Sequence, residues 1–236
     1  MYNSLTSKIV PVIAIDGPSA SGKGSVAQLV ARALNFHYLD SGALYRIVAF
    51  AATKNCVAWN DPNGLTELAK SLNIYFKDHE VFLNGNCITQ EVRTEDMSRG
   101  ASEVAVFSDV RSALLTLQHD FRQQPGLVAD GRDMGSVVFS DAQLKIFLNA
   151  SVETRAQRRY NQLINKNCVA NYNQILNDLK VRDTRDSQRN TAPLMQTDDA
   201  LLLDTTNLGI NEAVERIILA YKDSTNFKSN KDFKYV

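Results

Sequence analysis

A glycine-rich segment near the N-terminus carries the clearest chemical signal in the chain. Residues 12–25 read VIAIDGPSASGKGS, so an apolar run stops at a loop that ends in Gly22-Lys23, and a helical pattern follows. Glycines let successive backbone N–H groups turn toward one point, and the following helix adds unpaired N–H groups and partial positive charge. Lys23 can then reach the outer phosphates of a nucleoside triphosphate. The segment predicts an anion-binding loop, called the phosphate loop below (residues 17–25).

The next hydroxyl departs from the usual pattern of such loops. Ser or Thr ordinarily follows the Gly-Lys pair, but Gly24 intervenes and the hydroxyl arrives at Ser25. We therefore expect the loop to hold Mg²⁺ less directly than in a GTPase. Asp130 closes the apolar run 127–129, where a second carboxylate commonly meets Mg²⁺ through water, although it could equally cap the turn into Gly131. Ser25 and Asp130 are the candidate metal ligands.

Arginine is concentrated where a phosphate site would need positive charge. Arg46 follows Asp40-Ser41-Gly42, and Arg132 follows the run 127–129. Two clusters lie further on, namely Arg155, Arg158 and Arg159, and then Arg182, Arg185 and Arg189. The i, i+3, i+7 spacing predicts the second cluster on one helical face with Asp186. A solvated helix with its own ion pairs is the alternative for any single arginine, but the set predicts a converging phosphate site.

Short apolar runs predict the framework that positions these residues. Four of them are typical of buried parallel strands, at 12–15, 127–129, 144–148 and 201–203. Helical patterns separate most of these runs, and a final helix carries apolar residues from Ala213 to Tyr221. We therefore expect an α/β fold with three layers (α/β/α) and a parallel sheet at its core. Asp40, after the run 36–39, could either cap a helix or contact a substrate.

Two stretches interrupt this alternation. Residues 74–76, 80–83 and 86–88 read as an antiparallel meander with a hairpin at Asn84-Gly85, which predicts a small inserted subdomain at 61–98. Residues 153–193 contain two arginine-rich helical segments without a core of their own, as in a mobile lid. The remaining core would comprise residues 9–60, 99–152 and 194–222, followed by a loose polar tail at 223–236.

Composition narrows the class of protein. The 236 residues carry 26 basic and 26 acidic side chains, so the net charge of zero argues against nucleic acid or an acidic membrane as the main partner. The three cysteines have no CxxC spacing, which fits a reducing compartment, and no signal peptide or membrane-spanning run is evident. We expect a cytoplasmic protein.

Six segments together resemble one family. GPSASGKGS, LDSGALYR, LVADGRDMGSVVF, LKIFLNAS, RAQRR and VRDTRDSQR occur in this order, and the chain is similar to the bacterial cytidylate kinases, a branch of the nucleoside monophosphate kinases, over about residues 9–222. The resemblance implies a parallel-sheet core, a monophosphate-binding insert and an arginine-rich lid. It also implies transfer of the γ-phosphate of ATP to CMP or dCMP with Mg²⁺, by a monomer.

The resemblance also implies roles for individual residues. The ATP phosphates would be wrapped by Gly17, Pro18, Ser19, Ala20, Ser21, Gly22, Lys23, Gly24 and Ser25, with Arg158 nearby. Cytosine would be read by Ser102, Arg111, Asp133 and Arg189, the pentose held by Ser41, Arg182 and Asp186, and the acceptor phosphate by Arg46 and Arg132. Charge on the transferring group would be balanced by Lys23, Arg132, Arg155, Arg159, Arg182 and Arg185.

Other readings of the same residues remain open. A kinase for UMP, AMP or a small metabolite would share the phosphate loop and the lid but lack the GRDMG and RDxRD pairing. A nucleotide-dependent switch would need the guanine-specifying Asn-Lys-x-Asp, and the nearest match, residues 165–168, lacks the carboxylate. A nucleotide-sensing or RNA-binding module without turnover fits poorly with zero net charge.

Overall fold

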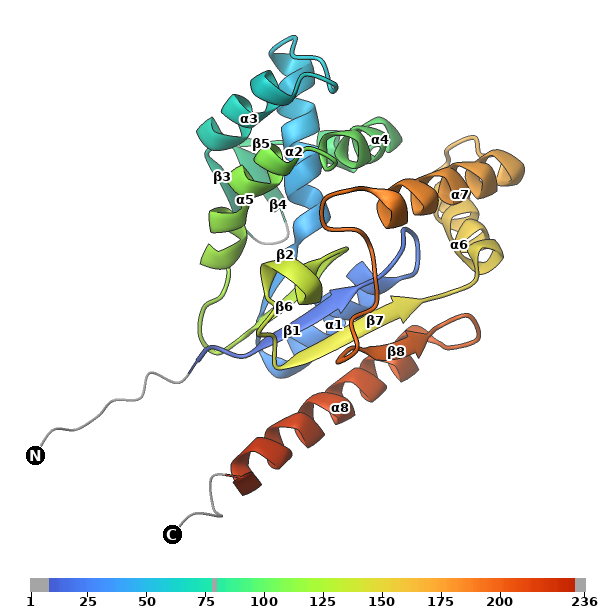
Figure 1. Ribbon diagram of the computed structural model, residues 1–236. Coiled ribbons are helices and arrows are strands. Elements are labelled where there is room, and N and C mark those ends of the chain that lie inside the picture. The colour runs from blue at the N-terminus through green and yellow to red at the C-terminus, as the bar shows by residue number, and fades with distance from the viewer. Residues whose placement is uncertain (1–8, 78–79, 232–236) are drawn as a thin grey trace, which may run out of the picture.

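Five parallel strands form the central sheet of the molecule (Figure 1). The computed structural model describes residues 9–77 and 80–231. The strands are β1 (Val12–Asp16), β2 (His37–Asp40), β6 (Leu127–Gly131), β7 (Leu144–Asn149) and β8 (Leu201–Asp204). They pair in the order β2-β6-β1-β7-β8, so β1 lies at the centre and delivers the phosphate loop there.

The α/β fold and all four predicted strands are confirmed, and β2 is a fifth strand at one edge. Of its residues only Leu39 is buried. A strand with one buried position lacks the continuous apolar run that marks a strand covered on both faces, so its signal is weak.

Helices cover both faces of the sheet, which explains why every residue of β1 is buried. Val12 and Ala14 pack in a core cluster with α2 (Ser41–Lys54), α4 (Glu95–Val104) and α5 (Ser108–Asp120). Ile13 and Ile15 face the opposite side, in a cluster with α1 (Lys23–Leu34) and α8 (Ile210–Lys231). Alternate side chains of β1 therefore pack into two different cores, one on each face of the sheet.

The predicted antiparallel meander forms a second, separate sheet. Its strands are β3 (Ile74–Lys77), β4 (Glu80–Leu83) and β5 (Asn86–Cys87), paired in that order. Asn84 and Gly85 have φ values of 50° and 84°, as the tight hairpin turn requires. The helix α3 (Pro62–Ser71) precedes the meander, and the 3₁₀ turn η1 (Glu91–Arg93) follows it.

Two helices, α6 (Val152–Asn165) and α7 (Tyr172–Gln188), form the arginine-rich lid and pack against each other. Ser151 and Asn171 cap their N-termini through side-chain oxygens. The expectation that Arg189 shares a helical face with Arg182 and Arg185 is wrong. The helix ends at Gln188, and Arg189 follows it with an extended ψ of 142°.

The C-terminal helix is longer than the apolar pattern indicates. It continues past Lys222 to Lys231, so this part of the expected loose tail is helical, and residues 232–236 lie outside the described part of the chain. Within the described ranges, no helix is both long and apolar enough to cross a membrane.

Candidate active site

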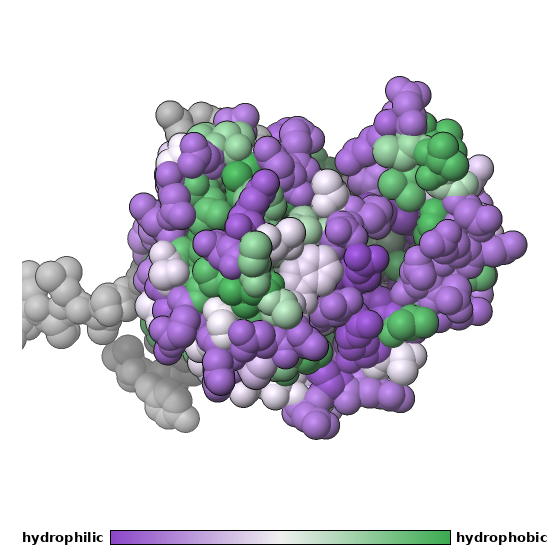
Figure 2. Space-filling view, turned by 90° about the horizontal axis from the view of Figure 1, so that it is seen from above, coloured by the Kyte–Doolittle hydropathy of each residue, from purple (hydrophilic) through white to green (hydrophobic). Residues whose placement is uncertain are grey.

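A cavity of about 700 Å³ opens at the carboxyl ends of β1, β2 and β6. The phosphate loop, α2, α4, the loop after β6 and α7 surround it. Seen from above, hydrophilic side chains gather along the hollow between the lid and the rest of the molecule (Figure 2). The sequence-predicted residues that line the cavity are Ser19, Ala20, Lys23, Gly24, Ser41, Arg46, Ser102, Arg111, Asp130, Arg132, Asp133, Arg159, Arg182, Arg185, Asp186 and Arg189.

The phosphate loop turns tightly from β1 into α1. A Cβ on Gly17, whose φ is 156°, would lie 2.0 Å from the Leu148 carbonyl oxygen, so only glycine fits there. Gly22 caps α1 in a left-handed conformation with φ 93°. The buried Lys23 ammonium donates to the Pro18 carbonyl at 3.2 Å. Burial, with the nearby charge of Arg132, lowers the pKa of Lys23 below its ordinary value, and an anion bound beside it would favour the charged ammonium form.

Asp130 lies beside Lys23, at the end of β6. Its Oδ2 accepts a 3.0 Å hydrogen bond from the Tyr38 hydroxyl and lies 3.1 Å from where a Cβ on Gly24 would stand. Burial and the charge of Asp40 raise the pKa of Asp130. A buried carboxylate facing a second carboxylate and a phosphate loop suits a divalent cation that takes its other ligands from phosphate oxygens and water. This donor set fits Mg²⁺.

A buried ion pair also lines the cavity. The Arg111 guanidinium pairs with the Asp133 carboxylate, and both side chains are at most 9% exposed. Arg111 also donates to the Ala105 carbonyl and lies over the Tyr45 ring, 5.6 Å from its centroid. Arg189 approaches Asp133 to 3.9 Å. Arginine donors and a carboxylate acceptor are thereby fixed in one buried cluster.

The last residue of β2 and residues of α2 also line the cavity. Asp40 caps α2 by accepting from the Ala43 N–H at 3.0 Å, which confirms the capping alternative. The Ser41 hydroxyl donates to the Gln118 side chain at 2.8 Å. Arg46, one turn further along α2, donates to Ser98 at 3.4 Å.

The lid contacts α4 and the loop after β6 through several polar side chains. Arg182 donates to the Ser98 hydroxyl at 2.7 Å, and Arg185 donates to the Ser102 hydroxyl at 3.2 Å. Arg132, after β6, donates through Nε to Asp186 at 2.7 Å. A further pair joins Arg159 to Glu95 at the start of α4. The lid arginines therefore share one cavity with the core residues.

Other predicted residues are turned away from the cavity. Arg155 is buried, forms two hydrogen bonds with Asp183 and donates to the Ser19 carbonyl. Arg158 donates to the carbonyls of Ser21 and Thr205. In this structure both arginines support the backbone of the phosphate loop. Predicted residues that do not line the cavity are Gly17, Pro18, Ser21, Gly22, Ser25, Arg155 and Arg158.

Two arginine donors in the cavity wall make no hydrogen bond within the described part of the chain. They are Nε of Arg182 and one terminal nitrogen of Arg189, both buried atoms. Each lies near a carboxylate, at 4.0 Å from Asp186 and 3.9 Å from Asp133, respectively. Buried polar atoms are nearly always paired, so unpaired guanidinium donors here are well suited to acceptor groups of a ligand.

Several supporting residues escaped the sequence analysis. Tyr38, Ser98 and Gln118 hold site residues through hydrogen bonds, and Asp183 neutralises Arg155. Asp16 binds the loop after β6. Only Asp16 had a usable signal, because a carboxylate that ends a wholly apolar strand has to find buried donors.

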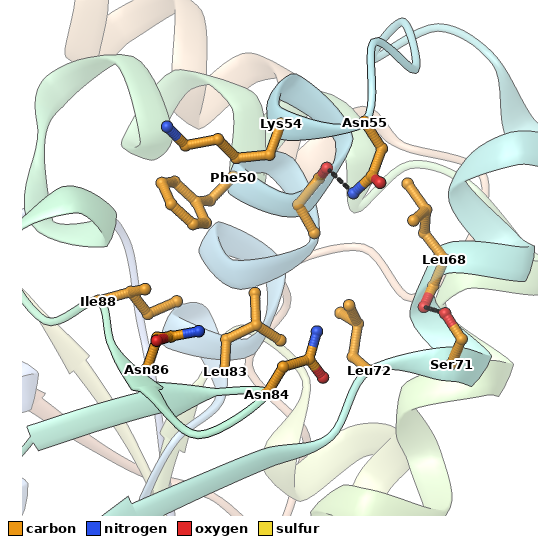
Figure 3. Close-up of a pocket in the computed structure, with 11 residues that line it drawn as sticks. Phe50, Lys54, Asn55, Leu68, Ser71, Leu72, Leu83, Asn84, Asn86 and Ile88 are labelled. Atoms are coloured by element: carbon orange, nitrogen blue, oxygen red, sulfur yellow. Dashed lines mark hydrogen bonds between the residues drawn. The ribbon is translucent and has the colours of Figure 1, made fainter.

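A second cavity, of about 390 Å³, lies between α2, α3 and the β4–β5 hairpin (Figure 3). Phe50, Leu68, Leu83 and Ile88 contribute apolar surface, and Lys54 is the charged side chain among the lining residues. A phosphate binds best where several cationic donors converge, which this lining does not offer. The chemistry described above therefore belongs to the larger cavity.

Comparisons with known proteins agree with this geometry. The family model described as cytidylate kinase matches residues 13–223. The chain is 51% identical over 215 residues to a protein named cytidylate kinase from Nitrosomonas europaea, covering 91% of this chain and 96% of that protein. It is 55% identical over 209 residues to a protein of the same name from Chromobacterium violaceum, covering 89% and 94%.

Two solved structures that this chain resembles have low sequence identity to it. A gluconokinase from Sinorhizobium meliloti aligns over 97% of this chain and 99% of its own, with a TM-score of 0.47 and 14% identity. A shikimate kinase from Bacteroides thetaiotaomicron aligns over 90% and 98%, with a TM-score of 0.42 and 13% identity. These likenesses are too low to add to the assignment. On its sequence match over most of its length, the chain belongs to the cytidylate kinase family.

Proposed function

We propose that this protein transfers the γ-phosphate of ATP to CMP or dCMP, giving ADP and CDP or dCDP. One observation carries the proposal most directly. The phosphate loop with Lys23 and the buried Arg111–Asp133 pair line the same cavity, together with arginines of the lid and of the core. A donor phosphate and a base-bearing acceptor can therefore meet in one enclosed space. The family of named cytidylate kinases supports this reaction.

Positioning and electrostatics would carry the chemistry. The phosphate group of CMP is already ionised near neutral pH, so the acceptor oxygen needs no general base. Lys23 would hold the donor phosphates, while Arg46 and Arg132 would hold the acceptor phosphate in line with the γ-phosphorus. Lid arginines Arg159, Arg182 and Arg185 would balance the charge that spreads over the transferring group.

Metal binding follows from the carboxylate beside the phosphate loop. We assign the principal contact with Mg²⁺ to Asp130, through water, because its buried carboxylate faces Lys23 and Asp40. Ser25 remains a weaker candidate, since it is exposed and does not line the cavity. When bound, the ion would neutralise charge on the donor phosphates.

Base selectivity would depend on the cluster around Asp133. Cytosine presents an N4 amino donor beside the N3 and O2 acceptors, whereas uracil reverses the first two polarities. A carboxylate or hydroxyl from Asp133 or Ser102 facing N4, with Arg111 or Arg189 facing N3 or O2, would disfavour uracil. Ser41 and the Arg182–Asp186 pair would hold the pentose.

The lid would close fully over both substrates and exclude water, which otherwise could accept the phosphoryl group. Arg159, Arg182 and Arg185 of the lid contact α4 through their side chains, and a movement of the lid could break these contacts. We propose 153–193 as the moving unit, 61–98 as the monophosphate-binding insert, and a cytoplasmic monomer as the working form.

An ADP-release assay tests the proposal. ATP and Mg²⁺ would be supplied with CMP, dCMP, UMP, AMP or no acceptor. Fast turnover with CMP and dCMP alone is the expected result. Turnover favouring another acceptor would overturn the cytosine-reading assignments while keeping the phosphate loop and the lid. ADP release that needs no acceptor would return the protein to the class of ATPases or switches.

A further inference from the structure

The Asp16 carboxylate connects the strand before the phosphate loop to the segment after β6, and it does not line the cavity. Asp16 is the last residue of β1 and immediately precedes Gly17 of the phosphate loop. Its Oδ1 accepts a 2.8 Å hydrogen bond from the Met134 N–H, and its Oδ2 accepts a 2.8 Å hydrogen bond from the Gly135 N–H. The side chain is buried and is absent from the cavity-lining residues.

These two N–H groups belong to the segment that carries Arg132 and Asp133. After β6 the chain reverses so tightly that a Cβ on Gly131 would lie 2.9 Å from the Met134 side chain. The π-helical turn η2 (Met134–Val138) begins directly after Asp133. The N–H groups at the start of a helical turn have no hydrogen-bond partner within that turn. An acceptor from another segment can therefore bind them and fix the position of the turn.

The strand register explains why Asp16 is placed to do this. In the parallel β1–β6 pair, Asp16 lies opposite Gly131, one residue before Arg132. The Asp16 side chain therefore lies beside the tight turn of the chain that follows β6. Burial opposes ionisation and raises the pKa of Asp16 to about 6, while the two backbone N–H groups act in the opposite direction. Near pH 7 the carboxylate is ionised, so both contacts are charge-assisted hydrogen bonds.

We propose that Asp16 is a positioning residue that fixes Arg132 and Asp133 relative to the phosphate loop and thereby sets selectivity for the acceptor base. The inference rests on the proposed function for its substrate, and it adds a residue that contacts neither nucleotide. Because Asp16 is continuous with the phosphate loop, a displacement of that loop moves the acceptor-reading segment with it.

Asp16→Asn is the most informative substitution. The amide keeps the size and one acceptor, but its NH₂ group then faces a backbone N–H, so one of the two contacts is lost. An uncharged side chain also removes the desolvation cost of the carboxylate, which favours folding of the variant. Asp61→Asn is the matched control, because Asp61 also accepts two backbone N–H bonds, from Asn63 and Gly64, but does not line the cavity.

The readout is the ratio of kcat/KM for CMP to that for UMP. Loss of a charge-assisted contact predicts a fall of about tenfold in this ratio for Asp16→Asn, with the KM for ATP changed less than about threefold. Asp61→Asn keeps the wild-type ratio. A structural role alone would lower Tm and leave the ratio and the KM for CMP at wild-type values, and that result would overturn the proposal.

A measurement on the unaltered protein covers the case in which Asp16→Asn does not fold. Amide hydrogen exchange at Met134 and Gly135 should slow when ADP alone binds, because the phosphate loop orders Asp16. Equal exchange rates at these two amides with and without ADP would overturn the inference. A wild-type protein that fails to phosphorylate CMP rejects the proposed function instead, and the exchange response still decides the role of Asp16.

Discussion

Nε of Arg132 donates a 2.7 Å hydrogen bond to Oδ2 of Asp186, and this contact joins the loop after β6 to the lid helix α7. Burial opposes ionisation of Asp186, but the charges of Arg132 and Arg182 outweigh it and hold the pKa of this carboxyl below its ordinary value. An acceptor phosphate bound to Arg132 would share its guanidinium with Asp186. If Arg132 holds the acceptor phosphate as proposed, one side chain would link the position of the lid to occupancy of the acceptor site.

Asp186→Asn should raise the KM for CMP about tenfold or more while changing the KM for ATP much less, because Arg132 and the proposed pentose site both lose a charged partner. Initial-rate kinetics with each substrate varied in turn measure the effect. Asp141→Asn is the control, because Asp141 forms an ion pair with Arg122 away from the cavity. Equal changes in the two KM values would contradict this role.

The same variant has a stability signature with a defined sign. A carboxyl whose pKa is lower in the folded than in the unfolded protein stabilises the fold above the unfolded value of about 3.9, and this contribution disappears as the pH falls through the folded value. The unfolding free energy of Asp186→Asn should be lower than that of wild type by about 2 kcal/mol at pH 7. Urea titrations should show the gap closing below pH 4, and a constant gap would argue against the ion pair.

Lys23→Ala should lower kcat by a factor of about 10² to 10³ or more while leaving the fold intact, because a preorganised cation facing the donor phosphates is lost. The matched control is Lys70→Ala, which removes an exposed lysine paired with Glu67 on α3. Circular dichroism and Tm would establish folding in both variants. Near-normal turnover of Lys23→Ala would remove the phosphate loop from the reaction.

Residues close in the sequence could be placed from the sequence, whereas contacts made by helix packing could not. The phosphate loop was found because its glycines, lysine and flanking strand lie within one short segment. Arg155 was predicted to balance charge on the transferring group, and in this structure it pairs with Asp183 on the other lid helix. Only the packing of α6 against α7 brings these two residues together, and no spacing along one helix encodes that.

The end of the lid helix α7 was predicted wrongly. The spacing of Arg182, Arg185 and Arg189 is consistent with one face, but the helix ends before Arg189, whose Nε donates to the Ala192 carbonyl instead. Arg189 still reaches the cavity because the chain turns back there. A regular spacing in the sequence predicts that residues share one side of a helix only as far as the helix continues. Backbone hydrogen bonds determine where the helix ends.

Asp133→Ala should reduce selectivity for CMP over UMP far more than affinity for ATP, because the carboxylate proposed to face the base is lost. It also leaves Arg111 buried without its partner, which should cost about 3–5 kcal/mol of stability. Asp133→Asn, which keeps one acceptor, separates the two effects. An unchanged ratio of kcat/KM for CMP and UMP in a folded variant would remove Asp133 from base recognition.

Asp16 should give the protein a pH-dependent stability of the opposite sign to that of Asp186. Its pKa is raised to about 6 by burial, so the folded protein holds a proton that the unfolded chain releases above about pH 4. The unfolded state then binds fewer protons, and stability falls as the pH rises from about 4 to 6. A shift of this size corresponds to about 3 kcal/mol.

Since Asn does not titrate, the unfolding free energy of Asp16→Asn relative to wild type should rise by about this amount across the same pH interval. Urea titrations of both proteins at pH 4, 5, 6 and 7 measure it, and parallel pH profiles would show that Asp16 is not the buried ionising group inferred from its contacts.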